Sequence, residues 1–153
     1  MPESVLNPAP IVRALQAAFA RGASRRELLD LAARRMRAAG PPYTSVYLYM
    51  VHGNDLVLEA SDGRETEHRR IPVGKGLCGQ AVAERRDINV PDVGAAPGYL
   101  ACNLETQSEL VVLIRRNDEI LGQIDVDSDV PAGFSAAEEA AAREVADALA
   151  VLL

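Results

Sequence analysis

The chain contains two cysteines, Cys78 and Cys102, and a pair of thiols can carry out redox chemistry. Cys78 follows the stretch "GKG" and falls in the first turn of a predicted short helix, where unpaired N–H groups and the helix dipole stabilise an anion. Because Lys75 adds a positive charge nearby, we expect a lowered pKa for the Cys78 thiol. The alternative is that Cys78 packs under the helix as a small apolar residue.

Cys102 lies in a long predicted loop, residues 91–107, which also holds several glycines and prolines. Loops of this length inside a domain are more often functional or mobile than idle. Such freedom suits a sulfur that must form and break a disulfide, for which the two Cα atoms must come within about 7 Å. If the two cysteines pair, we expect a transient bond that is either catalytic or redox-sensing.

Three acidic residues form a second candidate group. Asp125 and Asp127 lie two positions apart in the predicted strand "QIDVDS" and therefore share one face, and Glu109 enters the partner strand. Three neighbouring carboxylates do not all ionise at low cost, so one is expected to have a raised pKa and to donate a proton near neutral pH. Two alternatives remain open: the aspartates are exposed at a strand end, or the three carboxylates hold a hard divalent cation.

Composition excludes several other functions. A net charge of -6 argues against a nucleic-acid partner, which requires clustered basic residues. His52 and His68 lack ligand spacing to the cysteines or carboxylates, so no metal site is predicted from them. No apolar run approaches the roughly 20 residues that span a bilayer, and the chain does not open with a secretion signal. We expect no membrane partner and a cytoplasmic location.

Helices are predicted at both ends of the chain. The second of two N-terminal helices opens with a capping box formed by Ser24 and Glu27. Ser135 and Glu138 predict another capping box, which opens a final amphipathic helix. A short site helix is predicted over residues 77–85.

Between these helices the pattern changes to strands. They are predicted at residues 43–51, 56–60, 69–73, 87–90, 108–116 and 119–128. Polar turns join the first two and the last two into hairpins, and Pro72 makes the third an edge strand because proline cannot donate to a ladder. The first strand alternates, with Val46, Leu48 and Met50 on one face and Tyr43, Ser45, Tyr47 and Tyr49 on the other.

The order of elements predicts an α+β fold, in which a central antiparallel sheet carries the N- and C-terminal helices on one face. Residues 1–153 are expected to form one domain: helices in 1–42, the sheet with the site helix and loops in 43–130, and the last helix in 135–153. The outer faces of the terminal helices suit a homodimer interface. The alternative, that these helices only cover the core, is equally compatible with the pattern.

Five short stretches, taken in order, resemble a GAF domain: "GKGLCGQAV", "VPDV", "PGYLAC", "SELVV" and "LGQIDVDS". More narrowly, they are similar to the free methionine-(R)-sulfoxide reductases, which are single GAF domains. The resemblance covers nearly the whole chain. "SEL" and "IDVDS" occur in many GAF domains and indicate the fold, whereas the cysteine pair, with the spacing of the reductases, is the more specific signal.

The resemblance implies a mechanism. A Cys102 thiolate would attack the sulfoxide sulfur of free methionine-(R)-sulfoxide while protonated Glu109 hydrogen-bonds the sulfoxide oxygen. Cys78 would then attack the resulting sulfenic acid to form a disulfide, which a thioredoxin-like reductant clears; no bound cofactor is implied. Asp125 and Asp127 would hold the α-ammonium group. The dipole argument for Cys78 favours the reverse order of the cysteines, so both orders stay open.

The chain departs from the reductase pattern at two places. A third cysteine is expected before the "IP" turn, where Glu67 and His68 stand instead. A tryptophan on the first strand is missing: Ser45 lies near its place, and Tyr49 matches a nearby aromatic that would line the substrate pocket. The alternative function is therefore a non-catalytic GAF sensor that binds another small metabolite or responds to redox state.

Overall fold

An antiparallel sheet divides the protein into two layers in the computed structural model, which describes residues 4–99 and 104–153. The strands are β1 (Ser45–His52), β2 (Asp55–Asp62), β3 (Arg70–Pro72), β4 (Ile88–Val90), β5 (Ser108–Arg116) and β6 (Glu119–Ser128). The helices are α1 (Pro8–Ala20), α2 (Arg25–Arg37), α3 (Gly76–Glu84) and α4 (Ala136–Leu152), with a 3-10 turn, η1, at Val93–Ala95. The expected α+β architecture is confirmed.

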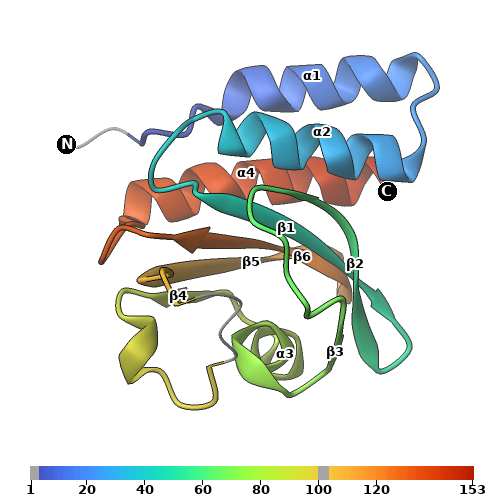
Figure 1. The fold of residues 1–153 in the computed structure, drawn as a ribbon. Helices are drawn as coiled ribbons and strands as arrows, with labels where there is room; N and C mark the ends of the chain where they lie inside the picture. The colour runs from blue at the N-terminus through green and yellow to red at the C-terminus, as the bar shows by residue number, and fades with distance from the viewer. Residues whose placement is uncertain (1–3, 100–103) are drawn as a thin grey trace.

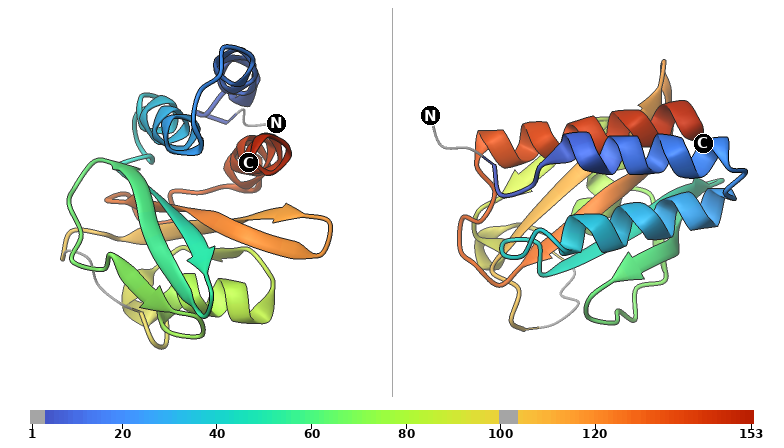
Figure 2. Two further views of the ribbon diagram at one scale, coloured as in Figure 1. Left: turned by 90° about the vertical axis from the view of Figure 1, so that its right-hand side faces the viewer. Right: turned by 90° about the horizontal axis from the view of Figure 1, so that it is seen from above.

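The strand order is β3-β2-β1-β6-β5-β4, and every neighbouring pair is antiparallel. Helices α1, α2 and α4 lie together on one face of the sheet, and α3 lies on the other (Figures 1 and 2). Both predicted hairpins form, β1 with β2 and β5 with β6. The strand that contains Pro72 is at the sheet edge, as its missing N–H requires.

Alternation along β1 separates two cores. Val46, Leu48 and Met50 pack against the three-helix layer, while Tyr47 and Tyr49 pack on the α3 side. The prediction for Tyr43 is wrong. It precedes the strand, so the period of two does not apply to it, and it is buried in the helix-side core.

The two predicted capping boxes differ. Ser24 and Glu27 form a reciprocal box at the start of α2. Ser135 caps α4 by accepting from the Glu138 N–H, but the Glu138 side chain does not return the bond. Its carboxylate instead accepts from the Val5 N–H at 2.5 Å and from the Tyr43 hydroxyl at 2.7 Å. Buried donors from distant segments therefore replace the local capping partner.

Among residues 4–99 and 104–153, none of the helices combines the length and apolar character needed to cross a membrane.

Candidate functional site

A small cavity that is partly open to solvent lies between α3 and the sheet. Its lining residues are Tyr49, His68, Ile71, Lys75, Gly76, Leu77, Cys78, Tyr99, Glu109 and Asp125. The fold thus brings four predicted site residues to one cavity: Tyr49, Cys78, Glu109 and Asp125. Asp127 is not among the lining residues, and Cys102 lies outside the described residues.

Sheet register brings the acidic residues together. Asp127 on β6 pairs with Glu109 on β5 and with Ser45 on β1, and Asp125 is two positions along the same strand. Alternation places all of these side chains on the α3 face. Asp125 and Asp127 are each 2% exposed, so the alternative of solvent-exposed aspartates at a strand end is wrong.

Close backbone contact brings Cys78 to the same place. A Cβ at Gly79 would lie 2.6 Å from the Pro72 carbonyl oxygen, so the first turn of α3 packs this closely only because residue 79 is glycine. The Gln123 side-chain amide donates to the Cys78 carbonyl at 2.9 Å and ties the helix to β6. Cys78 consequently faces the sheet and is buried.

The Cys78 thiol contacts two carboxyl groups. Its Sγ lies 3.9 Å from Glu109 Oε2, and one potential ligand atom each from Cys78, Glu109 and Asp125 lies within 4.8 Å of the others. Burial raises the pKa of the Cys78 thiol well above its usual value, and the charges of Asp125 and Glu109 raise it further. The expected lowering by the helix dipole and Lys75 is therefore wrong, because desolvation and the facing carboxyls outweigh both.

The pKa values of the two buried aspartates are raised as well. Burial raises the pKa of Asp125, against the opposing effect of its hydrogen bonds with Glu109 and Cys78. Burial raises the pKa of Asp127 strongly, Asp125 and Asp129 add to the shift, and Arg64 opposes it. The expectation that a carboxyl in this group has a raised pKa is confirmed.

Several buried oxygens at the site have no hydrogen-bond partner among the described residues. They are Gln123 Oε1, Asp125 Oδ1 and Asp127 Oδ2. A buried acceptor without a partner costs free energy, and a ligand that brings a hydrogen-bond donor, such as an ammonium group, would offset this cost. Hard divalent cations prefer six or more oxygen ligands, whereas the compact group here contains two carboxyls and a protonated thiol, a poor match to such an ion.

Some residues at this cavity were missed as site residues. Tyr99 lines it from the long loop, and its only sequence signal was its place beside the "LAC" stretch. His68 lines it because the Tyr49 hydroxyl donates to the His68 carbonyl at 2.7 Å and holds that segment against β1. No local pattern in the sequence indicates either contact.

Asp127→Asn is expected to flatten the dependence of stability on pH. The pKa of Asp127 is raised in the folded state, so protonated Asp127 stabilises the folded protein relative to the unfolded chain. This stabilisation is fully present below the unfolded-state pKa of about 4 and is lost as pH rises through the folded-state pKa. Relative to wild type, the variant should gain on the order of 1 kcal/mol in free energy of unfolding between pH 4 and pH 8. Urea unfolding at both pH values measures this change.

The matched control is Asp118→Asn, at an exposed position in the turn between β5 and β6. It should change stability equally at the two pH values. An Asp127→Asn variant that follows the wild-type curve at every pH would show that the Asp127 carboxyl does not titrate differently on folding.

Three comparisons relate the chain to known proteins. A model of the GAF domain family matches residues 24–153. A protein of Escherichia coli named free methionine-R-sulfoxide reductase is 34% identical over 97 residues, which cover 63% of this chain and 58% of that protein. The chain spans about half the length of the curated relatives it matches.

Solved structures match over a larger share. The type II free methionine-R-sulfoxide reductase of Thermoplasma acidophilum superposes with a TM-score of 0.81 at 40% identity, covering 84% of this chain and 91% of that one. The free methionine-R-sulfoxide reductase of Neisseria meningitidis, in complex with its substrate, gives a TM-score of 0.85 at 27% identity, covering 99% and 93%.

Proposed function

The chain belongs to the GAF domain family, and from that premise we propose that it reduces free methionine-(R)-sulfoxide to methionine. The observation that carries this proposal is the contact of a buried thiol with two carboxyl groups at one small cavity. A thiol supplies the electrons and a carboxyl supplies the proton that sulfoxide reduction needs. Similarity to proteins named for this reaction supports the same assignment.

We expect the substrate to be a free amino acid because of the unpartnered acidic oxygens. Asp125 Oδ1 would accept from the α-ammonium group, and Asp127 Oδ2, which also lacks a partner among the described residues, would offer a second acceptor two positions along β6. Tyr49 would pack against the apolar part of the substrate, since its ring lines the cavity and its hydroxyl already donates to the His68 carbonyl. A methionine residue within a peptide has no free α-ammonium group for these oxygens to bind.

In the first chemical step, the Cys102 thiolate attacks the sulfoxide sulfur. The sulfoxide oxygen takes a proton from Glu109 and ends on the Cys102 sulfur as a sulfenic acid, while methionine leaves. The sulfoxide is thereby reduced by two electrons and the cysteine is oxidised by two. Assigning the attack to Cys102 follows from the raised pKa of the Cys78 thiol, which stays protonated near neutral pH and is a poor initiating nucleophile.

In the second step, the Cys78 sulfur attacks the sulfenic sulfur, a disulfide forms and the hydroxyl leaves as water. Glu109, left ionised by the first step and lying beside the thiol, would accept the proton that Cys78 loses, and the departing hydroxyl would take its second proton from solvent. A dithiol reductant of the thioredoxin class then restores both thiols, and no bound cofactor is required. Because recycling needs a reducing compartment, we propose a cytoplasmic location.

We also propose a homodimer formed through the terminal helices. A groove between α1 and α4 is lined by several apolar side chains, and one of them, Val151, is 81% exposed. A second copy of the chain would cover this surface.

Methionine release in the presence of dithiothreitol tests the reductase function. We expect turnover with free methionine-(R)-sulfoxide and at least 100-fold less with the (S) epimer, since a bound sulfoxide presents its oxygen to Glu109 in only one configuration. Peptide-bound methionine-(R)-sulfoxide should not react. Absence of turnover, together with tight binding of another metabolite, would instead favour the sensor function.

A further inference from the structure

Arg64 follows β2 and is held against β1 through its own backbone. Its N–H donates to Ser45 Oγ at 2.9 Å, and its carbonyl accepts from the Tyr47 hydroxyl at 2.6 Å. At the preceding residue a Cβ on Gly63 would lie 2.5 Å from Ser45 Oγ, so only glycine permits this approach. The Arg64 backbone therefore has a fixed position beside Ser45, which pairs with Asp127 at the acidic end of the sheet.

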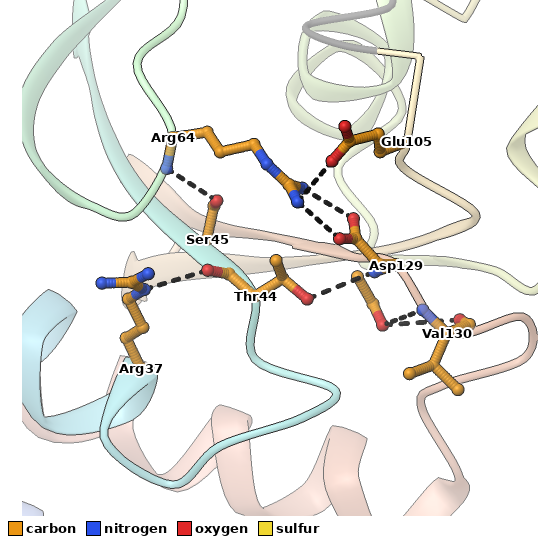
Figure 3. A network of polar contacts seen from close by, with 8 residues as sticks. Arg37, Thr44, Ser45, Arg64, Glu105, Asp129 and Val130 are labelled. Carbon is orange, nitrogen blue, oxygen red and sulfur yellow. Dashed lines mark hydrogen bonds and ion pairs between the residues drawn. The ribbon is translucent and has the colours of Figure 1, made fainter.

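The Arg64 guanidinium joins two more segments (Figure 3). It donates two parallel hydrogen bonds to the Asp129 carboxylate, at 2.7 and 2.6 Å, just beyond the end of β6. The same guanidinium lies 2.6 Å from Glu105 Oε2. A connection after β2, the end of β6 and the chain before β5 thus meet at one side chain.

The solvent exposure of these side chains determines how much the ion pair between Arg64 and Glu105 contributes to stability. Arg64 and Glu105 side chains are 36% and 68% exposed, and an isolated ion pair at that exposure contributes little. Here, however, the bidentate contact with Asp129 and the fixed backbone already hold the guanidinium in place. Glu105 consequently loses less side-chain entropy in pairing with it than it would with a freely moving arginine.

Glu105 lies between Cys102 and Glu109 in the sequence. Since each residue of extended chain spans about 3.5 Å, an anchor at Glu105 limits how far any neighbouring residue can move away from the sheet. A tether at this point acts on residues 104–107, which lead directly into the start of β5, where Glu109 lies.

We propose that Arg64 is a positioning residue for sulfoxide reduction, because its ion pair with Glu105 holds residues 104–107, which lie between the two proposed reacting residues in the sequence, against the sheet. The inference rests on the proposed reductase function. Arg64 itself does not contact the cavity, so it acts through the chain that it holds. Its role is specific to the attack step and does not concern binding of the amino acid.

A kinetic cycle tests this role with Arg64→Ala, Glu105→Gln and the double variant. Each single change should lower kcat about tenfold and leave KM within about twofold, because the attacking group is misplaced while substrate contacts remain. The double variant should be no slower than Arg64→Ala, since both substitutions remove the same ion pair between Arg64 and Glu105. Arg64→Lys, which keeps the charge without the planar fork, should recover part of kcat.

The matched control is Arg70→Ala, which removes an exposed ion pair with Asp55 at the other edge of the sheet. It should leave kcat unchanged. Unchanged kcat in Glu105→Gln, or losses that multiply in the double variant, would overturn the positioning role.

Amide hydrogen exchange of residues 104–107 separates this inference from the reductase function, because it needs no substrate. Exchange should become about tenfold faster in Arg64→Ala and Glu105→Gln and stay unchanged in Arg70→Ala. Unaltered exchange in Arg64→Ala and Glu105→Gln would overturn the tether, whether or not the protein releases methionine. Faster exchange in a protein whose wild type releases no methionine overturns the reductase function and leaves the tether standing.

Discussion

In a single turnover without reductant, Cys78→Ser is expected to release about one methionine per chain, whereas Cys102→Ser releases none. The burial of Cys78 against Glu109 and Asp125 is the reason. A thiol whose pKa is raised by desolvation and by two facing carboxyls is protonated near neutral pH, so it does not start the reaction. Loss of the attacking thiol should lower the rate of release about 1000-fold or more, as loss of a covalent nucleophile usually does.

Fully reduced protein, freed of dithiothreitol and mixed with excess free methionine-(R)-sulfoxide, gives the measurement. Released methionine is counted per chain, and the remaining thiols are titrated. Wild type should lose both thiols as the disulfide forms, while Cys78→Ser should trap a sulfenic acid that a dimedone probe labels. Release of one methionine by Cys102→Ser, and none by Cys78→Ser, would assign the attack to Cys78 and contradict the pKa argument.

Hairpin patterns were sufficient to predict much of the acidic group. Strand alternation places Asp125 and Asp127 on one face. The turn at Asn117 and Asp118 alone would set Glu109 opposite Val126, and a β-bulge between Ile114 and Arg115 shifts the register by one residue, which brings Glu109 opposite Asp127. The alternation is local in sequence and the structure confirms it, whereas the bulge was not predicted from the hairpin pattern. The sequence of β6 does not indicate whether that face is buried or exposed. Its burial depends on α3, which covers the face and is distant in the sequence.

The chemistry of Cys78 could not be predicted for the same reason. Its place in the first turn of α3 favours a thiolate, but the pKa follows from how closely the helix approaches the sheet. That approach depends on the missing Cβ at Gly79 and on the amide of Gln123, which is 45 residues away in the sequence. Local sequence indicates the helix dipole, and only the packed structure shows the desolvation that outweighs it.

Arg64 illustrates a further limit. The residue lies in a polar turn after β2 and carries no motif, yet it contacts segments 65 residues downstream at Asp129 and, between them, at Glu105. Ion pairs of this kind leave no periodicity in the sequence, since each partner lies on a different connection. Glu138 is a similar case: Ser135 caps its N–H as predicted, but its carboxylate does not complete the capping box and instead binds the distant Val5 N–H.

Glu109→Gln is expected to lower kcat for methionine release by about 100-fold or more. Glutamine has nearly the same shape and keeps an N–H donor toward the sulfoxide oxygen, but it has no carboxyl proton to transfer. Because proton transfer occurs only in the transition state, kcat and kcat/KM should fall by the same factor. Binding of the product methionine to the reduced protein should change little, since Asp125 and Asp127 remain.

The control for this prediction is Glu138→Gln, the same substitution at another glutamate that is 4% exposed. Glu138 accepts from Tyr43 and the N-terminal segment on the opposite side of the sheet, so its loss should lower the free energy of unfolding by about 1 kcal/mol and leave kcat unaffected. Equal losses of kcat in the two variants would indicate a general effect of removing a buried carboxylate. A Glu109→Gln enzyme with wild-type kcat would require another proton donor, and Asp125, whose raised pKa and position beside the thiol suit that role, would become the next residue to replace.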